Sequence, residues 1–172
     1  MEIKPTKMTT YILTTIINER PKAFALIDSE KDVYGTVCFY PFQNGTIMIY
    51  EINGLPKEKG VFGFHIHEGN TCINDTSIPY EKTKNHFNPT NSNHPYHLGD
   101  LPPIFSTKGK AWAIIYIDKF KPYDIVGRTL VVHKEPDDFG GGAPPPDLLC
   151  DQLTVWTVSS VQAALAVSAV LM

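Results

Sequence analysis

All six histidines of the chain fall into one ordered arrangement, and this restricts the possible folds more than any other feature. They lie in four short segments, which are Gly-Phe-His65-Ile-His67-Glu, His86-Phe-Asn-Pro, His94-Pro-Tyr-His97-Leu-Gly-Asp100 and Gly-Arg-Thr-Leu-Val-Val-His133. Histidine is the commonest metal ligand among side chains. Six imidazoles and a carboxylate are too many for one four-coordinate ion. The pattern therefore predicts a site for two ions, and a fold that brings these segments together.

The first and last of these segments read as β-strands. His65 and His67 are two residues apart, so on a strand both side chains leave the same face and can hold one ion. His133 ends another strand and can supply a further ligand. A lone His-x-His pair on a strand is often purely structural, and it is the order of the whole set that favours metal binding.

The other ligands fall in a segment of different composition, residues 69–103, which is rich in Asn, Thr, Pro and Tyr. A loop this long inside a compact domain is normally functional or disordered. His94, His97 and Asp100 step by three along it, which a tight turn can gather around one ion, and Gly99 relieves the backbone there. We expect bound metal to order this loop.

Segments rich in β-branched and aromatic residues predict strands over residues 22–26, 33–40, 46–52, 63–68, 111–117 and 129–132, and a last strand can form over 153–158. Turn signals separate them, which is typical of an antiparallel sandwich or barrel. The sequence divides into an N-terminal extension (1–19), a β domain (20–155) and an apolar tail (156–172). A helix docked on the body or a poorly ordered tail is expected at that end, rather than a membrane span.

The composition excludes some classes of function. The net charge of −3 argues against a nucleic-acid partner. No secretory signal is evident at the N-terminus, so the expected location is cytoplasmic. The sequence does not determine the oligomeric state, and a homodimer is compatible with it.

The segments 63–69, 86–89, 97–101 and 127–133 resemble the copper/zinc superoxide dismutase family, and the resemblance runs from roughly residue 20 to 139. It implies an all-β, Greek-key barrel or sandwich of about eight antiparallel strands with a long metal-binding loop. It also implies copper bound by His65, His67, His86 and His133, and zinc bound by His86, His94, His97 and Asp100. His86 would bridge the two ions.

The function that the resemblance implies is the disproportionation of superoxide to dioxygen and hydrogen peroxide, an oxidoreductase reaction. His86 is the expected catalytic residue: it would release copper on reduction, carry a proton and rebind on oxidation. The alternative is a copper/zinc-binding protein of the same fold with little or no turnover, acting as a metal carrier or buffer.

Three further residues match family positions outside the ligand set. Asp137 matches an aspartate that hydrogen-bonds one copper-side and one zinc-side histidine; otherwise it is a solvated loop acid. Cys72 and Cys150 match the family's intrasubunit disulfide; otherwise they are buried thiols. Cys38, within an apolar strand, is expected in the core.

From residue 140 onward the sequence departs from the family. Asp147 occupies the position of a family arginine that attracts the anionic substrate, and no arginine follows Arg128. If Asp147 lies near the copper, we expect slower capture of superoxide, which salt would relieve. Alternatively, the altered segment carries Asp147 away from the pocket.

Overall fold

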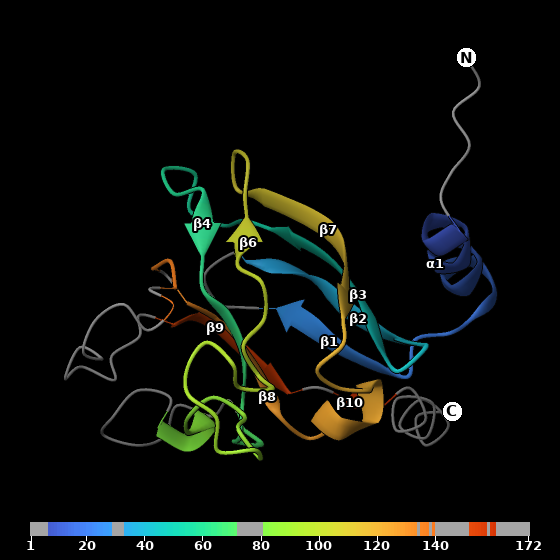
Figure 1. Ribbon diagram of the computed structural model, residues 1–172. Coiled ribbons are helices and arrows are strands. Elements are labelled where there is room, and N and C mark those ends of the chain that lie inside the picture. The colour runs from blue at the N-terminus through green and yellow to red at the C-terminus, as the bar shows by residue number, and fades with distance from the viewer. Residues whose placement is uncertain are drawn as a thin grey trace, which may run out of the picture.

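The computed structural model of the chain describes residues 7–28, 33–71, 81–133, 135–137, 139, 152–157 and 159–160. Its elements are, in order, α1 (Lys7–Asn18), β1 (Ala23–Asp28), β2 (Tyr34–Phe42), β3 (Gly45–Asn53), β4 (Val61–Phe62), β5 (Phe64–His67), the 3-10 helix η1 (Glu81–Thr83), β6 (Ile104–Phe105), β7 (Lys110–Ile117), the 3-10 helix η2 (Pro122–Ile125), β8 (Thr129–His133), β9 (Gln152–Thr157) and β10 (Ser159–Ser160). The fold is therefore mostly β (Figure 1).

The strands form three antiparallel sheets, ordered β10-β1-β2-β3-β7, β4-β6 and β5-β8-β9. The long strands follow the predicted ranges closely, so the prediction of an antiparallel β fold is confirmed. Among the described residues the sheets are not joined into a closed barrel. The predicted strand 63–68 forms as β5 and is shorter by one residue at each end, and Gly63 before it still exchanges backbone hydrogen bonds with His133 and Glu135.

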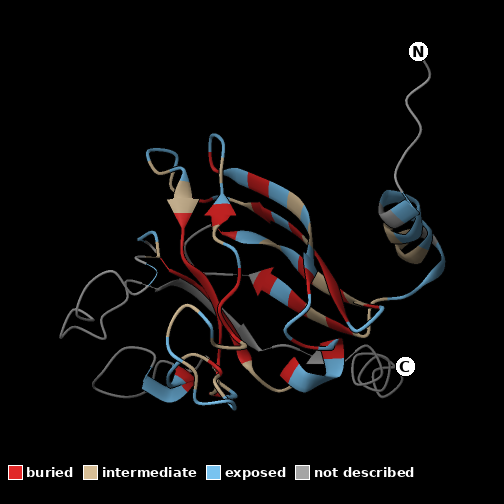
Figure 2. Cartoon of the chain, viewed as in Figure 1, coloured by how far each residue is buried: buried red, intermediate tan, exposed pale blue. Residues whose placement is uncertain are grey.

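The core lies between the five-stranded sheet and the sheet that carries the ligands. Phe39, Met48 and Ile52 from the first sheet are fully buried, as are Phe64 and Ile66 of β5. Tyr50 of β3 meets Phe64 edge to face at 5.9 Å between ring centroids. Because Phe64 and Ile66 alternate with His65 and His67, β5 places its apolar side chains on the core and its histidines on the opposite face. Figure 2 shows that β5 is buried along its whole length.

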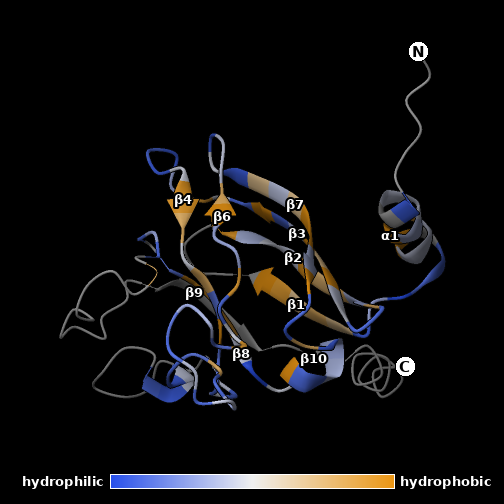
Figure 3. Ribbon diagram, in the orientation of Figure 1, coloured by the Kyte–Doolittle hydropathy of each residue, from blue (hydrophilic) through white to orange (hydrophobic). Residues whose placement is uncertain are grey.

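Residues 81–103 are mostly hydrophilic (Figure 3), and they meet the edge of β5 at His86 and Asp100. Outside the β fold, α1 lies beside the five-stranded sheet and contacts β2, and the sequence pattern did not predict it.

No helix in the described ranges has both the length and the apolar character that crossing a membrane would require. Cys38 is only partly buried on β2, contrary to the expectation of a core residue, and burial raises the pKa of its thiol.

Candidate metal centre

Two strands position His65, His67 and His133, the three candidate ligands that the sequence predicted on strands. β5 pairs with β8 so that His65 lies opposite Val131. The backbone of His133 donates a hydrogen bond to the carbonyl oxygen of Gly63 at 2.8 Å. A side chain at position 63 would meet Cβ of His133 at 3.2 Å, so the glycine leaves room for the His133 ring. All three rings therefore stand on one face of the β5–β8 pair.

The loop reaches the same face by pairing with the free edge of β5. Phe87 donates its backbone N–H to the carbonyl of Ile66 at 2.7 Å, and Ile66 donates to the carbonyl of Gly99 at 2.8 Å. A Cβ on Gly99 would lie 2.1 Å from the Ile66 carbonyl oxygen, so only glycine permits this approach. Both ends of the ligand-bearing segment, at His86 and at Asp100, are thus fixed beside His65 and His67.

The candidate ligands gather into two groups that share His86. One group is His65, His67, His86 and His133, and the other is His86, His94, His97 and Asp100; within each group one ligand atom per residue lies within 4.8 Å of the others. They are called the copper group and the zinc group below, after the ion that the family resemblance leads us to expect in each. The His86 ring centroid is 3.9 Å from that of His65 and 5.4 Å from that of His94. Every metal ligand expected from the sequence is therefore brought into one of these groups.

Hydrogen bonds from the protein leave particular ring nitrogens free to bind metal in the copper group. Nε2 of His65 lies 2.9 Å from Oδ2 of Asp137, and Nδ1 of His67 lies 2.7 Å from the carbonyl oxygen of Lys84. Because carboxylates and carbonyls only accept, these nitrogens carry the protons, which leaves lone pairs on Nδ1 of His65 and Nε2 of His67. The latter is 3.4 Å from Nε2 of His133.

Several of these nitrogens are buried without a partner. Within the described part of the chain, Nδ1 of His65, His94 and His133 make no hydrogen bond. Orphaned buried polar atoms are costly and call for an unseen partner such as an ion. Nδ1 of His94 lies 3.1 Å from Oδ2 of Asp100 without hydrogen-bond geometry, as expected of two ligands that face one ion. The residues therefore fit bound metal.

The zinc group converges on one carboxylate. Nδ1 of His86 lies 2.7 Å from Oδ1 of Asp100, and Nδ1 of His97 lies 3.2 Å from the same oxygen. Burial alone would raise the pKa of Asp100, but the hydrogen bond from His86 and the nearby imidazoles lower it to about 2. An ionised carboxylate with three imidazole nitrogens is a donor set that suits tetrahedral zinc.

Burial keeps the copper-side histidines neutral. Desolvation, followed by the neighbouring imidazole of His86, lowers the pKa of His67 to about 3, and burial with His65 and His67 nearby lowers that of His133 to about 2. Burial likewise lowers the pKa of His65. Neutral imidazoles at neutral pH present lone pairs, and a set of nitrogen ligands suits Cu(II).

Asp137 connects the two groups. Its Oδ2 accepts from Nε2 of His65, and its Oδ1 accepts from Nε2 of His94 at 2.8 Å. Although burial opposes ionisation, these hydrogen bonds hold the pKa of Asp137 well below its usual range. The structure thus places Asp137 between one histidine of each group, and its side chain is only 7% exposed.

Two contacts beside the site were not anticipated from the sequence. The Arg128 guanidinium lies over the Phe87 ring at 4.4 Å from its centroid, and Nη1 donates to the Glu68 carbonyl at 2.8 Å. Lys84 adopts φ 61°, in the left-handed region, and this turn aims its carbonyl at His67. Arg128 belongs to the segment before His133, but only the tertiary fold reveals its partner. Cys72, Cys150 and Asp147 lie outside the described residues.

Comparison with known proteins agrees with this geometry. The model of the copper/zinc superoxide dismutase family matches residues 33–152. A Cu-Zn superoxide dismutase 3 of Arabidopsis thaliana is 36% identical over 132 residues, which cover 70% of this chain and 77% of that protein. An extracellular Cu-Zn superoxide dismutase of Brugia pahangi is 33% identical over 144 residues, covering 77% of this chain and 69% of that protein. The chain therefore belongs to the copper/zinc superoxide dismutase family, a family of oxidoreductases that use copper and zinc.

Proposed function

We propose that this chain disproportionates superoxide at copper held by His65, His67, His86 and His133, beside zinc held by His86, His94, His97 and Asp100. Superoxide dismutation is the activity of the family to which the chain belongs. The observation that carries the residue assignment is the position of His86, which is a member of both ligand groups.

When bound, copper supplies one-electron redox chemistry and zinc supplies a fixed positive charge. Two superoxide ions and two protons give one dioxygen and one hydrogen peroxide, so one superoxide supplies the electron that the other accepts, and the protein must deliver two protons. His86 suits this role because its Nδ1 is engaged with the zinc group, 2.7 Å from Oδ1 of Asp100. Its Nε2 is then the nitrogen that can hold a proton and release it to the reduced substrate.

The other residues keep this imidazole and its neighbours in place. The Lys84 carbonyl fixes the ring of His67, and Asp137 fixes the rings of His65 and His94. The His86 side chain is 23% exposed, whereas His65, His67 and His133 are each at most 5% exposed. Solvent protons can therefore reach His86, while the remaining copper ligands are shielded.

The alternative function, a copper or zinc carrier without turnover, rests on the missing arginine after residue 128. Metal analysis of the purified protein, paired with a superoxide-decay assay, separates the two. The dismutase predicts one copper and one zinc per chain with rapid decay. Full metal content without decay would support the carrier and contradict the dismutase.

The finer features of the family are also proposed for this chain. They are Greek-key closure of the sheets into a barrel of about eight strands, a homodimer, a cytoplasmic location and a disulfide between Cys72 and Cys150. The antiparallel sheets support the first of these. Sedimentation of the metal-loaded protein tests the dimer, and mass analysis after alkylation without reductant tests the disulfide, with Cys38 as the single thiol expected to react.

A further inference from the structure

Lys119, just after β7, directs its side chain to the backbone of the ligand-bearing loop. Its Nζ donates to the carbonyl oxygens of Pro95 at 3.3 Å, His97 at 3.2 Å and Asp100 at 3.1 Å. An ammonium group has three N–H donors and no acceptor. These three backbone oxygens therefore engage all three N–H donors of Lys119. None of the three oxygens is a candidate metal-ligand atom.

The three carbonyls lie at or next to His94, His97 and Asp100, the zinc-group residues that the copper group does not share. Two belong to the ligands His97 and Asp100, and the third belongs to Pro95, which follows His94. One cation thus contacts the backbone beside all three. Because hydrogen bonds to charged groups are worth more than neutral ones, this contact can fix the loop where apolar packing is sparse.

Lys119 is itself held by a rigid neighbourhood. Ile117, two residues before it, is paired with Thr46 of β3, and the Thr46 hydroxyl donates to the carbonyl of Phe120 at 2.7 Å. Phe120 is 3% exposed and packs against Phe39. The lysine therefore extends from the edge of the five-stranded sheet rather than from a free loop.

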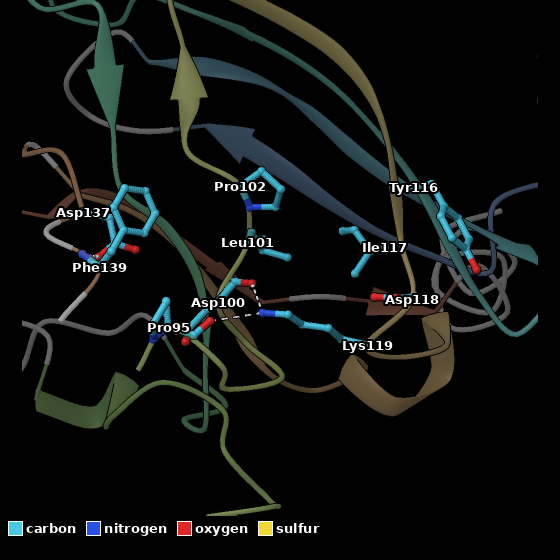
Figure 4. A pocket seen from close by; sticks show the side chains of 10 residues that line it. All are labelled: Pro95, Asp100, Leu101, Pro102, Tyr116, Ile117, Asp118, Lys119, Asp137 and Phe139. Carbon is cyan, nitrogen blue, oxygen red and sulfur yellow. Dashed lines mark hydrogen bonds between the residues drawn. The ribbon is translucent and has the colours of Figure 1, made fainter. Parts of the chain in front are cut away.

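A cavity of about 290 Å³ lies between that sheet edge and the loop. Tyr116, Ile117 and Lys119 line it from β7 and the residues that follow, and Pro95 and Asp100 line it from the loop (Figure 4). Side-chain packing does not close this space, and the Lys119 side chain crosses it to the loop backbone.

We propose that Lys119 is a positioning residue for the zinc group, which holds the backbone of the segment 95–100 so that His94, His97 and Asp100 face one ion. The inference rests on the zinc assignment proposed above, but not on dismutase turnover. The same contact acts before metal binds, because it joins the sheet to the loop without involving a ligand atom.

The test compares Lys119→Met, which keeps an apolar stem of similar length, with Lys110→Met, which removes an exposed lysine at the start of β7. We expect Lys119→Met to release zinc to a competing chelator about 10 to 100 times faster, as for partners that orient ligands, while copper affinity changes little. Cobalt placed in the zinc site should show altered visible absorption. Lys119→Arg, which keeps the charge, should restore most of the zinc retention.

A second measurement uses the protein without metal. Amide hydrogen exchange over residues 95–100 should be faster in Lys119→Met than in Lys110→Met, with exchange in β5 and β8 unchanged. Equal zinc release from the two variants, or equal loss of copper and zinc, would overturn the proposal. Slow superoxide decay in the unsubstituted protein would contradict the dismutase and leave the role of Lys119 standing.

Discussion

The two ligand groups are built from different kinds of structure. His65, His67 and His133 of the copper group stand on the paired strands β5 and β8 and are buried. His94 and His97 of the zinc group stand on one irregular segment and are half-buried, with side chains 20% and 17% exposed. A sheet fixes its side chains before any ion arrives, whereas the loop depends on backbone hydrogen bonds and on the ion itself. The copper group should therefore be the more preorganised of the two.

The shared residue gives the largest expected effect. Replacing His86 with Ala removes a ligand from both groups and the proposed proton carrier, so superoxide decay should slow by about 10² to 10⁴-fold. His94→Ala is the comparison, because it removes a ligand from the zinc group alone. It should lower zinc affinity first and leave copper bound, as measured by metal content and decay rate. Wild-type metal content and rate in both variants would show that the shared-ligand assignment is wrong.

Asp137→Asn tests whether one residue supports both groups. An amide presents one oxygen and one NH₂ group, so it cannot accept from both His65 and His94 as the carboxylate does. We expect both copper and zinc affinity to fall by about 10 to 100-fold in competition with chelators. Glu135→Gln is the control, since Glu135 is exposed and pairs with Lys59 outside the site. Weakening of only one metal would mean that Asp137 serves one group.

Acid should destabilise the metal-free protein, because the histidines of the copper group are buried in their neutral form. An unfolded histidine takes up a proton below about pH 6.5, but burial lowers the pKa of His67 to about 3 and that of His133 to about 2. Between the unfolded and folded pKa values, the unfolded state binds more protons than the folded state. The free energy of unfolding therefore falls as the pH falls. From pH 7 to 6 we expect the free energy of unfolding to decrease by roughly 1 to 2 kcal/mol.

Urea denaturation of the metal-free protein at the two pH values measures this decrease. His67→Gln, which cannot titrate, should make the dependence shallower. If the pH dependence were the same in the variant, titration of His67 would not contribute to it.

The strands could be predicted from the sequence because their signal is local. The expected strand over residues 46–52 becomes β3 (Gly45–Asn53), and that over 111–117 becomes β7. The expected strand over 63–68 becomes β5 (Phe64–His67), while the short strands β4 and β6, which pair with each other across about forty residues of sequence, give no comparable local signal. α1 was not predicted, since its threonine-rich sequence is a weak helix signal.

The ligand groups could be anticipated because residue type and order carry much of the information. The residues that position the ligand-bearing segments could not all be predicted from the sequence in the same way. Lys119 is one of two lysines that closely follow β7, and only the tertiary fold brings its ammonium to three carbonyls of the loop. Arg128 and Phe87 are likewise far apart in the sequence and meet only in the folded chain.

His86 belongs to both groups and Asp137 bonds to both, so under the proposed assignment the two metals do not bind independently. An ion in either group orients an imidazole or a carboxylate that the other group uses. Thermodynamic reciprocity then requires that zinc changes the affinity for copper by the same factor as copper changes the affinity for zinc. The order of loading is therefore a matter of kinetics, and the zinc group, whose unshared ligands lie on an irregular segment, is the step at which assembly of the centre can be delayed.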